Sequence, residues 1–100
     1  MVSLDLIRRL AERRARSELE THGEVRPSAQ LFYANTSDII YPNRDEPWAH
    51  FVTHMLAERT EYRAHALVLY RQVIGNAYVS VMIMPSDGVP IELHIPAEGV

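Results

Sequence analysis

The feature that most constrains the fold is a change of hydrophobic period near Ala64. Before it, Trp48–Leu56 places apolar side chains at helical spacing. After it come three runs rich in β-branched and apolar residues, at positions 64–74, 77–84 and 91–95. Turn residues separate these runs at Gly75-Asn76 and at Ser86–Pro90. The C-terminal part of the chain therefore predicts a three-stranded antiparallel meander.

Cap and turn residues divide the first half of the chain into a helix and two strands. Ser3 is a favoured N-cap and Gly23 suits the left-handed position after a helix, so we predict a helix from Ser3 to His22. Pro27 forces an extended backbone before it. Two short strands are predicted beyond it, at Ala29–Ala34 and Asp38–Tyr41.

A second helix is predicted between these strands and the meander, with Asp45 as its N-cap, Pro47 in its first turn and its end near Glu61. The element order is then α-β-β-α-β-β-β. Each helix has one apolar stripe that needs a sheet face. Residues 1–100 are therefore predicted to form a single α+β domain, a five-stranded antiparallel sheet with two helices. In element order this resembles the roadblock and profilin-like sandwiches, a topological analogy that carries no function.

Two stretches share motifs with other proteins. His22–Ala29 (HGEVRPSA) follows the predicted N-terminal helix, and Arg63–Pro96 contains the meander with its Asp-Gly turn. Together they resemble a group of small, uncharacterised single-domain proteins from GC-rich bacteria. Val25 stands where that group has an aromatic residue, and Met84-Pro85 where it has a Glu-His pair. The resemblance implies a bacterial protein and no particular activity.

The residue types that are absent exclude several kinds of chemistry. The chain has no Cys and no Lys, so all ten basic residues are Arg. Thiol nucleophiles, disulfides, Schiff-base lysines and the P-loop lysine are therefore excluded. The Gly-x-Ser-x-Gly motif of a nucleophilic serine is also absent. We expect a protein that is not an enzyme and that has no cofactor.

The charge and the hydropathy restrict the partners. The formal net charge is −3, whereas nucleic-acid-binding domains usually have a basic excess, so nucleic acid is not an expected partner. No apolar run approaches the length of a membrane span, and the N-terminus lacks the pattern of a secretory signal. We therefore expect a cytoplasmic protein without a membrane partner.

One helical segment offers a candidate metal site. His50, His54 and Glu58 follow one another at four-residue steps, which places them on one face of the predicted helix. Two imidazoles and a carboxylate can bind zinc or a similar ion, as in a small metal-dependent enzyme. The same pattern is typical of a solvated helix face, the interpretation that we favour. His65 and His94 would complete a metal site only if the fold brought them near.

The N-terminal helix offers a candidate basic surface. Five Arg fall within Arg8–Arg16, and Arg9, Arg13 and Arg16 share a face. Such a face can bind phosphate groups or an acidic partner, which makes a nucleic-acid-associated protein a second alternative. Pairing with Glu12 would instead make this an ordinary solvated surface, and no aromatic residue interleaves with the Arg side chains.

The run at 77–84 has two apolar faces, because both its odd and its even positions are largely apolar. We expect the second helix to cover one face, which leaves the other face to the first helix or to another subunit. The leading hypothesis is a small non-enzymatic interaction protein (a regulator, adaptor or toxin-neutralising partner) that acts as a homodimer or binds another protein. Its predicted interface has Tyr78, Met82 and Met84 at the centre and Arg9, Arg13 and Arg16 at the rim.

Overall fold

The protein is described by a computed structural model that covers residues 3–72 and 78–97. Its elements, in chain order, are α1 (Leu4–His22), β1 (Ser28–Phe32), β2 (Ser37–Ile40), α2 (Trp48–Glu61), β3 (Ala66–Gln72), β4 (Tyr78–Pro85) and β5 (Ile91–Pro96). The predicted α+β class and the order α-β-β-α-β-β-β are confirmed. No helix in the described ranges is long and apolar enough to cross a membrane.

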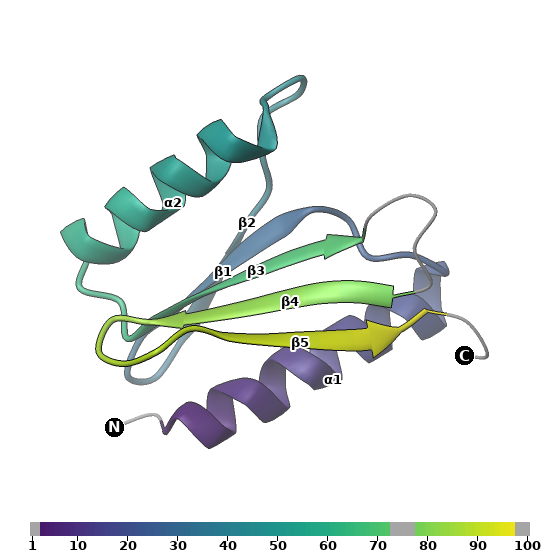
Figure 1. The fold of residues 1–100 in the computed structure, drawn as a ribbon, viewed down its shortest axis with the longest axis horizontal. Coiled ribbons are helices and arrows are strands. Elements are labelled where there is room, and N and C mark those ends of the chain that lie inside the picture. The colour runs from purple at the N-terminus through teal and green to yellow at the C-terminus, as the bar shows by residue number, and fades with distance from the viewer. Residues whose placement is uncertain (1–2, 73–77, 98–100) are drawn as a thin grey trace.

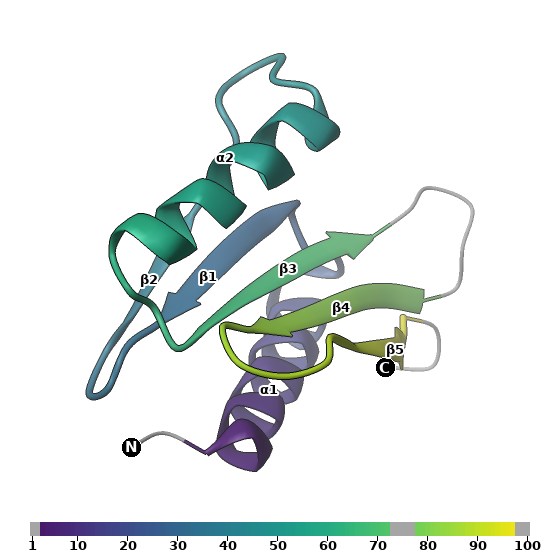
Figure 2. The same cartoon turned by 60° about the vertical axis from the view of Figure 1, so that its left-hand side comes forward.

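The five strands form one sheet in the order β2-β1-β3-β4-β5, and every neighbouring pair is antiparallel. The two helices lie on opposite faces of this sheet (Figures 1 and 2). Helix α1 packs against β4 and β5, whereas α2 packs against β3. Each helix therefore covers only part of its own face of the sheet.

Helix α1 has the predicted boundaries and caps. The Ser3 side chain accepts a hydrogen bond from the Leu6 backbone N–H at 3.1 Å, and Gly23 ends the helix at a φ of 75°. The Gly23 N–H donates to the Leu19 carbonyl at 2.9 Å. The buried side of the helix is made by Ile7, Ala11, Ala15 and Leu19. The two alanines let the helix backbone approach the sheet closely.

The prediction that Asp45 caps α2 was wrong. The N-cap is Pro47, no side chain caps the helix, and Asp45 has a left-handed φ of 66°. The physical reason is Pro47 itself. An Asp45 cap would accept a hydrogen bond from the amide of residue 47 or 48, and because Pro47 has no amide hydrogen, only Trp48 could donate it. Proline also keeps the preceding residue out of the helical region, so the helix starts only at Trp48.

The strands lie where they are predicted, with small shifts at their ends, and burial alternates along β4 and β5 but not along β1, which is buried throughout. A turn between β1 and β2 is closed by the Tyr33 N–H and the Thr36 carbonyl at 2.8 Å. The predicted turn at Ser86–Pro90 joins β4 to β5 and places Gly88 at a φ of 133°. The predicted Gly75-Asn76 turn lies outside the described residues, although β3 and β4 pair in the antiparallel sense that it requires.

The sheet separates two hydrophobic clusters. On one face, α1 packs on the odd-numbered side chains of β4, which are Val79, Val81 and Ile83. On the other face, Phe51 and Met55 of α2 pack on β1 and β3, with Met82 and Met84 at the margin of that cluster. The even-numbered face of β4 is thus on the α2 side of the sheet, and α1 does not cover it.

Candidate interaction groove

An apolar groove runs beside α2 across the open part of the sheet. It has a volume of about 560 Å³ and is lined by Trp48, Val52, Leu69, Arg71, Tyr78, Ser80, Met82, Met84, Pro90 and Glu92. One wall comes from α2, and β3 and β4 form the floor. Figure 1 shows why the groove exists: α2 lies over the β1 and β3 side of the sheet, and β4 and β5 extend beyond it.

The floor of the groove contains the residues predicted for the interface centre. Tyr78, Met82 and Met84 project from alternate positions of β4, and each is half-buried. Met82 is the sheet neighbour of Leu69 on β3 and of Glu92 on β5. The strand alternation thus gathers the three predicted residues along one surface. Their partial burial leaves apolar area that a partner can cover.

The rim of the groove is polar, and its side chains are held in place by their neighbours. The Arg71 guanidinium lies over the Trp48 ring, 5.3 Å from the ring centroid, which is a cation–π contact. Across the sheet, the rings of Tyr78 and His94 stack at 4.3 Å, and His94 also bonds Glu92. An apolar centre with a positioned polar rim is the usual anatomy of a protein–protein interface.

The Arg residues predicted for the rim lie elsewhere. Helix α1 is on the opposite face of the sheet, so Arg9, Arg13 and Arg16 do not border the groove of their own chain. They line a shallow open hollow of about 410 Å³ on the outer side of α1, together with Glu12, Ser17 and Glu20. The sequence could not show this, because the face that each helix covers depends on the sheet order.

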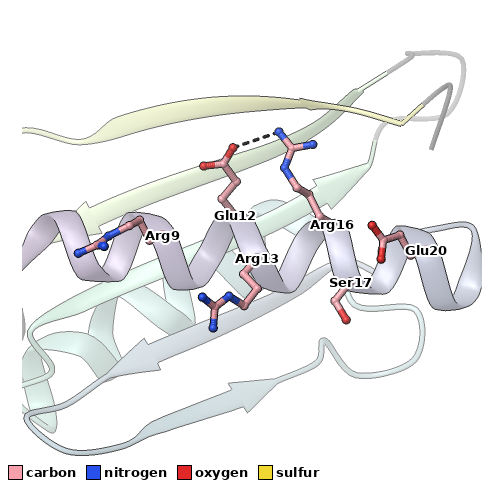
Figure 3. Close-up of a pocket in the computed structure, with 6 residues that line it drawn as sticks. All are labelled: Arg9, Glu12, Arg13, Arg16, Ser17 and Glu20. Atoms are coloured by element: carbon pink, nitrogen blue, oxygen red, sulfur yellow. Dashed lines mark hydrogen bonds and ion pairs between the residues drawn. The ribbon is translucent and has the colours of Figure 1, made fainter.

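The hollow on α1 carries mixed charge. Arg16 pairs with Glu12 at 3.1 Å, and Arg9 pairs with Asp5 at 3.2 Å. In Figure 3, Glu12 and Arg16 rise from one side of the helix, whereas Arg13 extends from the other side. The three arginines therefore do not converge on one point. This geometry is that of a solvated helix with ion pairs at four-residue spacing.

The three candidate metal ligands do not act as one group. His54 pairs with Glu58 at 3.3 Å, but His50 pairs with Glu46 at 2.6 Å, one turn earlier. The Asn43 backbone N–H and then the His50 side chain lower the pKa of the Glu46 carboxyl by hydrogen bonding. Across residues 3–72 and 78–97, no three His, Asp or Glu side chains gather closely enough to hold a metal ion. His65 directly precedes β3 and His94 lies on β5, so neither belongs to α2.

One member of the basic run plays a structural part that the sequence did not reveal. The Arg14 side chain is only 13% exposed, and its guanidinium lies 4.2 Å from the centroid of the Tyr70 ring. Its Nη2 donates to the Ser28 hydroxyl at 3.0 Å. The Tyr70 hydroxyl donates to Gln30 Oε1 at 2.7 Å. Burial raises the pKa of Tyr70 to about 12. This polar network joins α1 to β1 and β3.

No protein-family model, curated protein or solved structure matches the chain. The resemblance to small bacterial proteins and the analogy with roadblock and profilin-like sandwiches both stay predictions from the sequence. A function is therefore inferred from the surfaces described above, of which the groove beside α2 is larger and more apolar than the hollow on α1.

Proposed function

We propose that this protein is a small non-enzymatic interaction protein that acts as a two-fold homodimer. In the dimer, the groove of each copy receives the outer face of α2 from the other copy. The observation that carries this proposal is the apolar groove on the sheet, which lies beside an α2 surface formed by three exposed, uncharged residues: Ala49, Thr53 and Ala57.

The width of the sheet supports a missing helix on the α2 face. Five strands give four spacings of about 4.8 Å, so the sheet is about 19 Å across. Packed helices lie about 8–10 Å apart, so a face of this width takes two helices side by side. The α2 face has one helix, and the groove occupies the place of the second.

The outer face of α2 is suited to fill that place. Ala49, Thr53 and Ala57 are exposed and lie four residues apart. The residues that directly precede them, at 48, 52 and 56, lie on the groove side of α2 and at the margin of the core. Because successive residues are about 100° apart around a helix, Ala49, Thr53 and Ala57 form the adjacent strip of the helix surface. The uncharged face therefore continues the apolar wall of the groove. By contrast, Arg and Glu side chains dominate the outer side of α1.

Two-fold symmetry satisfies both surfaces at once. Because the groove and the uncharged face lie on the same side of the sheet, a two-fold axis can place each helix in the groove of the partner. An isologous contact of this kind buries the same patch twice, which helps it reach the roughly 1,000 Å² expected of a specific interface. The dimer would serve as a regulator, an adaptor or a toxin-neutralising partner. The bacterial origin and cytoplasmic setting stay predictions from the sequence.

A matched pair of surface substitutions tests the proposal. Ala57→Arg places a charge on the outer face of α2, and Ser17→Arg places the same side chain on the exposed outer side of α1. Both positions are exposed and helical, so neither change should alter stability by more than about 0.5 kcal/mol. We expect Ala57→Arg to shift the sedimentation equilibrium to monomer and Ser17→Arg to leave it unchanged. Equal association of the two variants would contradict the use of this face.

A further inference from the structure

We propose that the pocket at the C-terminal end of α2 binds the phosphoryl group of a small phosphate monoester. The pocket has a volume of about 290 Å³ and is lined by Arg59, Thr60, Arg63, Ala64, His65 and Ser86. This volume holds a phosphoryl group with a small organic substituent. The inference does not depend on the homodimer, because this pocket and the groove beside α2 have no lining residue in common.

The lining of the pocket is suited to an anion. It contains two guanidinium groups, an imidazole and two hydroxyls, and no carboxylate lines it among the described residues, although the whole chain has a net charge of −3. Within those residues, neither Arg59 nor Arg63 forms an ion pair, whereas three arginines of α1 each pair with a carboxylate. Two unpaired guanidinium groups outweigh the partial negative charge, about half a unit, of the helix end.

Backbone hydrogen bonds fix the frame of the pocket. The His65 N–H donates to the Phe32 carbonyl at 2.7 Å, and the Ser86 N–H donates to the His65 carbonyl at 2.9 Å. The Arg59 Nη1 donates to the Met84 and Pro85 carbonyls at 3.3 and 3.4 Å. These bonds occupy one nitrogen of the guanidinium. The N–H groups on Nη2 and Nε remain for an anion, whose oxygens match the fork of arginine donors.

Arg63 occupies a backbone position that favours glycine. Its φ is 55°, in the left-handed region, and the only other non-glycine residue with a positive φ among the described residues is Asp45. Arg63 follows the last residue of α2 and its cap, Tyr62, and the Ala64 N–H returns to the Arg59 carbonyl at 3.0 Å. Helices commonly place glycine in this conformation, because a Cβ is unfavourable there. The backbone conformation at this position does not favour arginine over glycine. The presence of arginine therefore indicates a role for its side chain.

This conformation provides a variant that separates binding from folding. Arg63→Gly removes the guanidinium and relieves the left-handed backbone, so its melting temperature without ligand should equal or exceed that of the wild type. Arg44→Gly is the matched control, because it removes an exposed arginine outside the pocket. The probes are inorganic phosphate and glycerol 3-phosphate at constant ionic strength, with chloride as the reference salt.

We expect both probes to raise the melting temperature of the wild type and of Arg44→Gly in a saturable way. In Arg63→Gly the apparent affinity should fall at least tenfold. Tighter binding of glycerol 3-phosphate than of inorganic phosphate would support a small phosphomonoester as the ligand, and equal binding would overturn that assignment in favour of free phosphate. A wild type that shows no saturable response, or an Arg63→Gly variant that responds like the wild type, would overturn the proposal. An equal loss in Arg44→Gly would also overturn it, since the response would then reflect net charge.

Discussion

Removing the Tyr70 hydroxyl tests the buried polar network that joins α1 to the sheet. Tyr70 is fully buried on the α1 face, and its hydroxyl donates to Gln30 Oε1 at 2.7 Å. Tyr70→Phe keeps the ring and its contact with the Arg14 guanidinium but leaves Gln30 Oε1 without this donor. Gln30 is only 8% exposed, so water has little access to replace the bond. We expect a loss of about 1–3 kcal/mol in the free energy of unfolding at neutral pH.

Because the Tyr70 hydroxyl titrates, the difference in the free energy of unfolding between the wild type and Tyr70→Phe depends on pH. Burial raises the pKa of Tyr70 from 10.0 to about 12, so the unfolded chain loses this proton first as the pH rises. Below pH 10 the favourable contribution of the neutral hydroxyl is fully present. Between pH 10 and pH 12 the folded state retains a proton that the unfolded state has lost, and the wild type loses about 1.4 kcal/mol of stability per pH unit. Tyr70→Phe lacks this loss.

Urea unfolding followed by far-UV circular dichroism measures both effects. The deficit of Tyr70→Phe should be present at neutral pH and should shrink or reverse between pH 10 and pH 12. Tyr62→Phe is the control, because the Tyr62 side chain is 58% exposed and its hydroxyl should contribute less than about 0.5 kcal/mol. A Tyr70→Phe deficit no larger than that of Tyr62→Phe, or one that is constant through pH 12, would refute the burial and hydrogen bonding of this hydroxyl.

Further substitutions test the core and the candidate metal face. Val81→Asp should unfold the domain, because Val81 is fully buried under α1 and a lone buried carboxylate costs several kcal/mol, which is comparable with the total stability. A cooperative thermal transition in this variant would be inconsistent with the burial of Val81. His50→Ala should change the free energy of unfolding by less than about 0.5 kcal/mol, because the His50 side chain is 72% exposed. A loss above about 2 kcal/mol would show that this helix face is not solvated. Metal analysis after dialysis should find no stoichiometric transition metal, and one bound zinc or nickel per chain that is lost in His54→Ala would revive the metal site.

The sequence predicted those parts of the fold that local chemistry determines. Ser3 and Gly23 cap α1 as expected, and the change of period near Ala64 located the meander. Strand alternation also placed Tyr78, Met82 and Met84 on one surface. The predicted start of α2 was wrong because Pro47 disfavours the helical region for Glu46, so the helix does not begin directly after Asp45.

Features that depend on long-range packing could not be predicted. Arg14 was indistinguishable from its neighbours in the basic run until the structure placed it against Tyr70, a residue far along the chain. The position of α2 over β3, which leaves the groove open, follows from a sheet order that periodicity does not contain. The left-handed backbone at Arg63 was equally hidden, because the residue that usually marks such a position is glycine.

The molar mass of the protein in solution tests the proposed dimer most directly. Light scattering of the wild type should give twice the 11.5 kDa mass of the chain. Met82→Glu with Met84→Glu should give the mass of one chain with an unchanged circular dichroism spectrum, because the charges fall on the groove floor and spare the Val79, Val81 and Ile83 core. Met82→Leu with Met84→Leu, which nearly conserves side-chain volume, should stay dimeric. A wild type that remains at 11.5 kDa at all concentrations, or a glutamate variant that remains a dimer, would contradict the account.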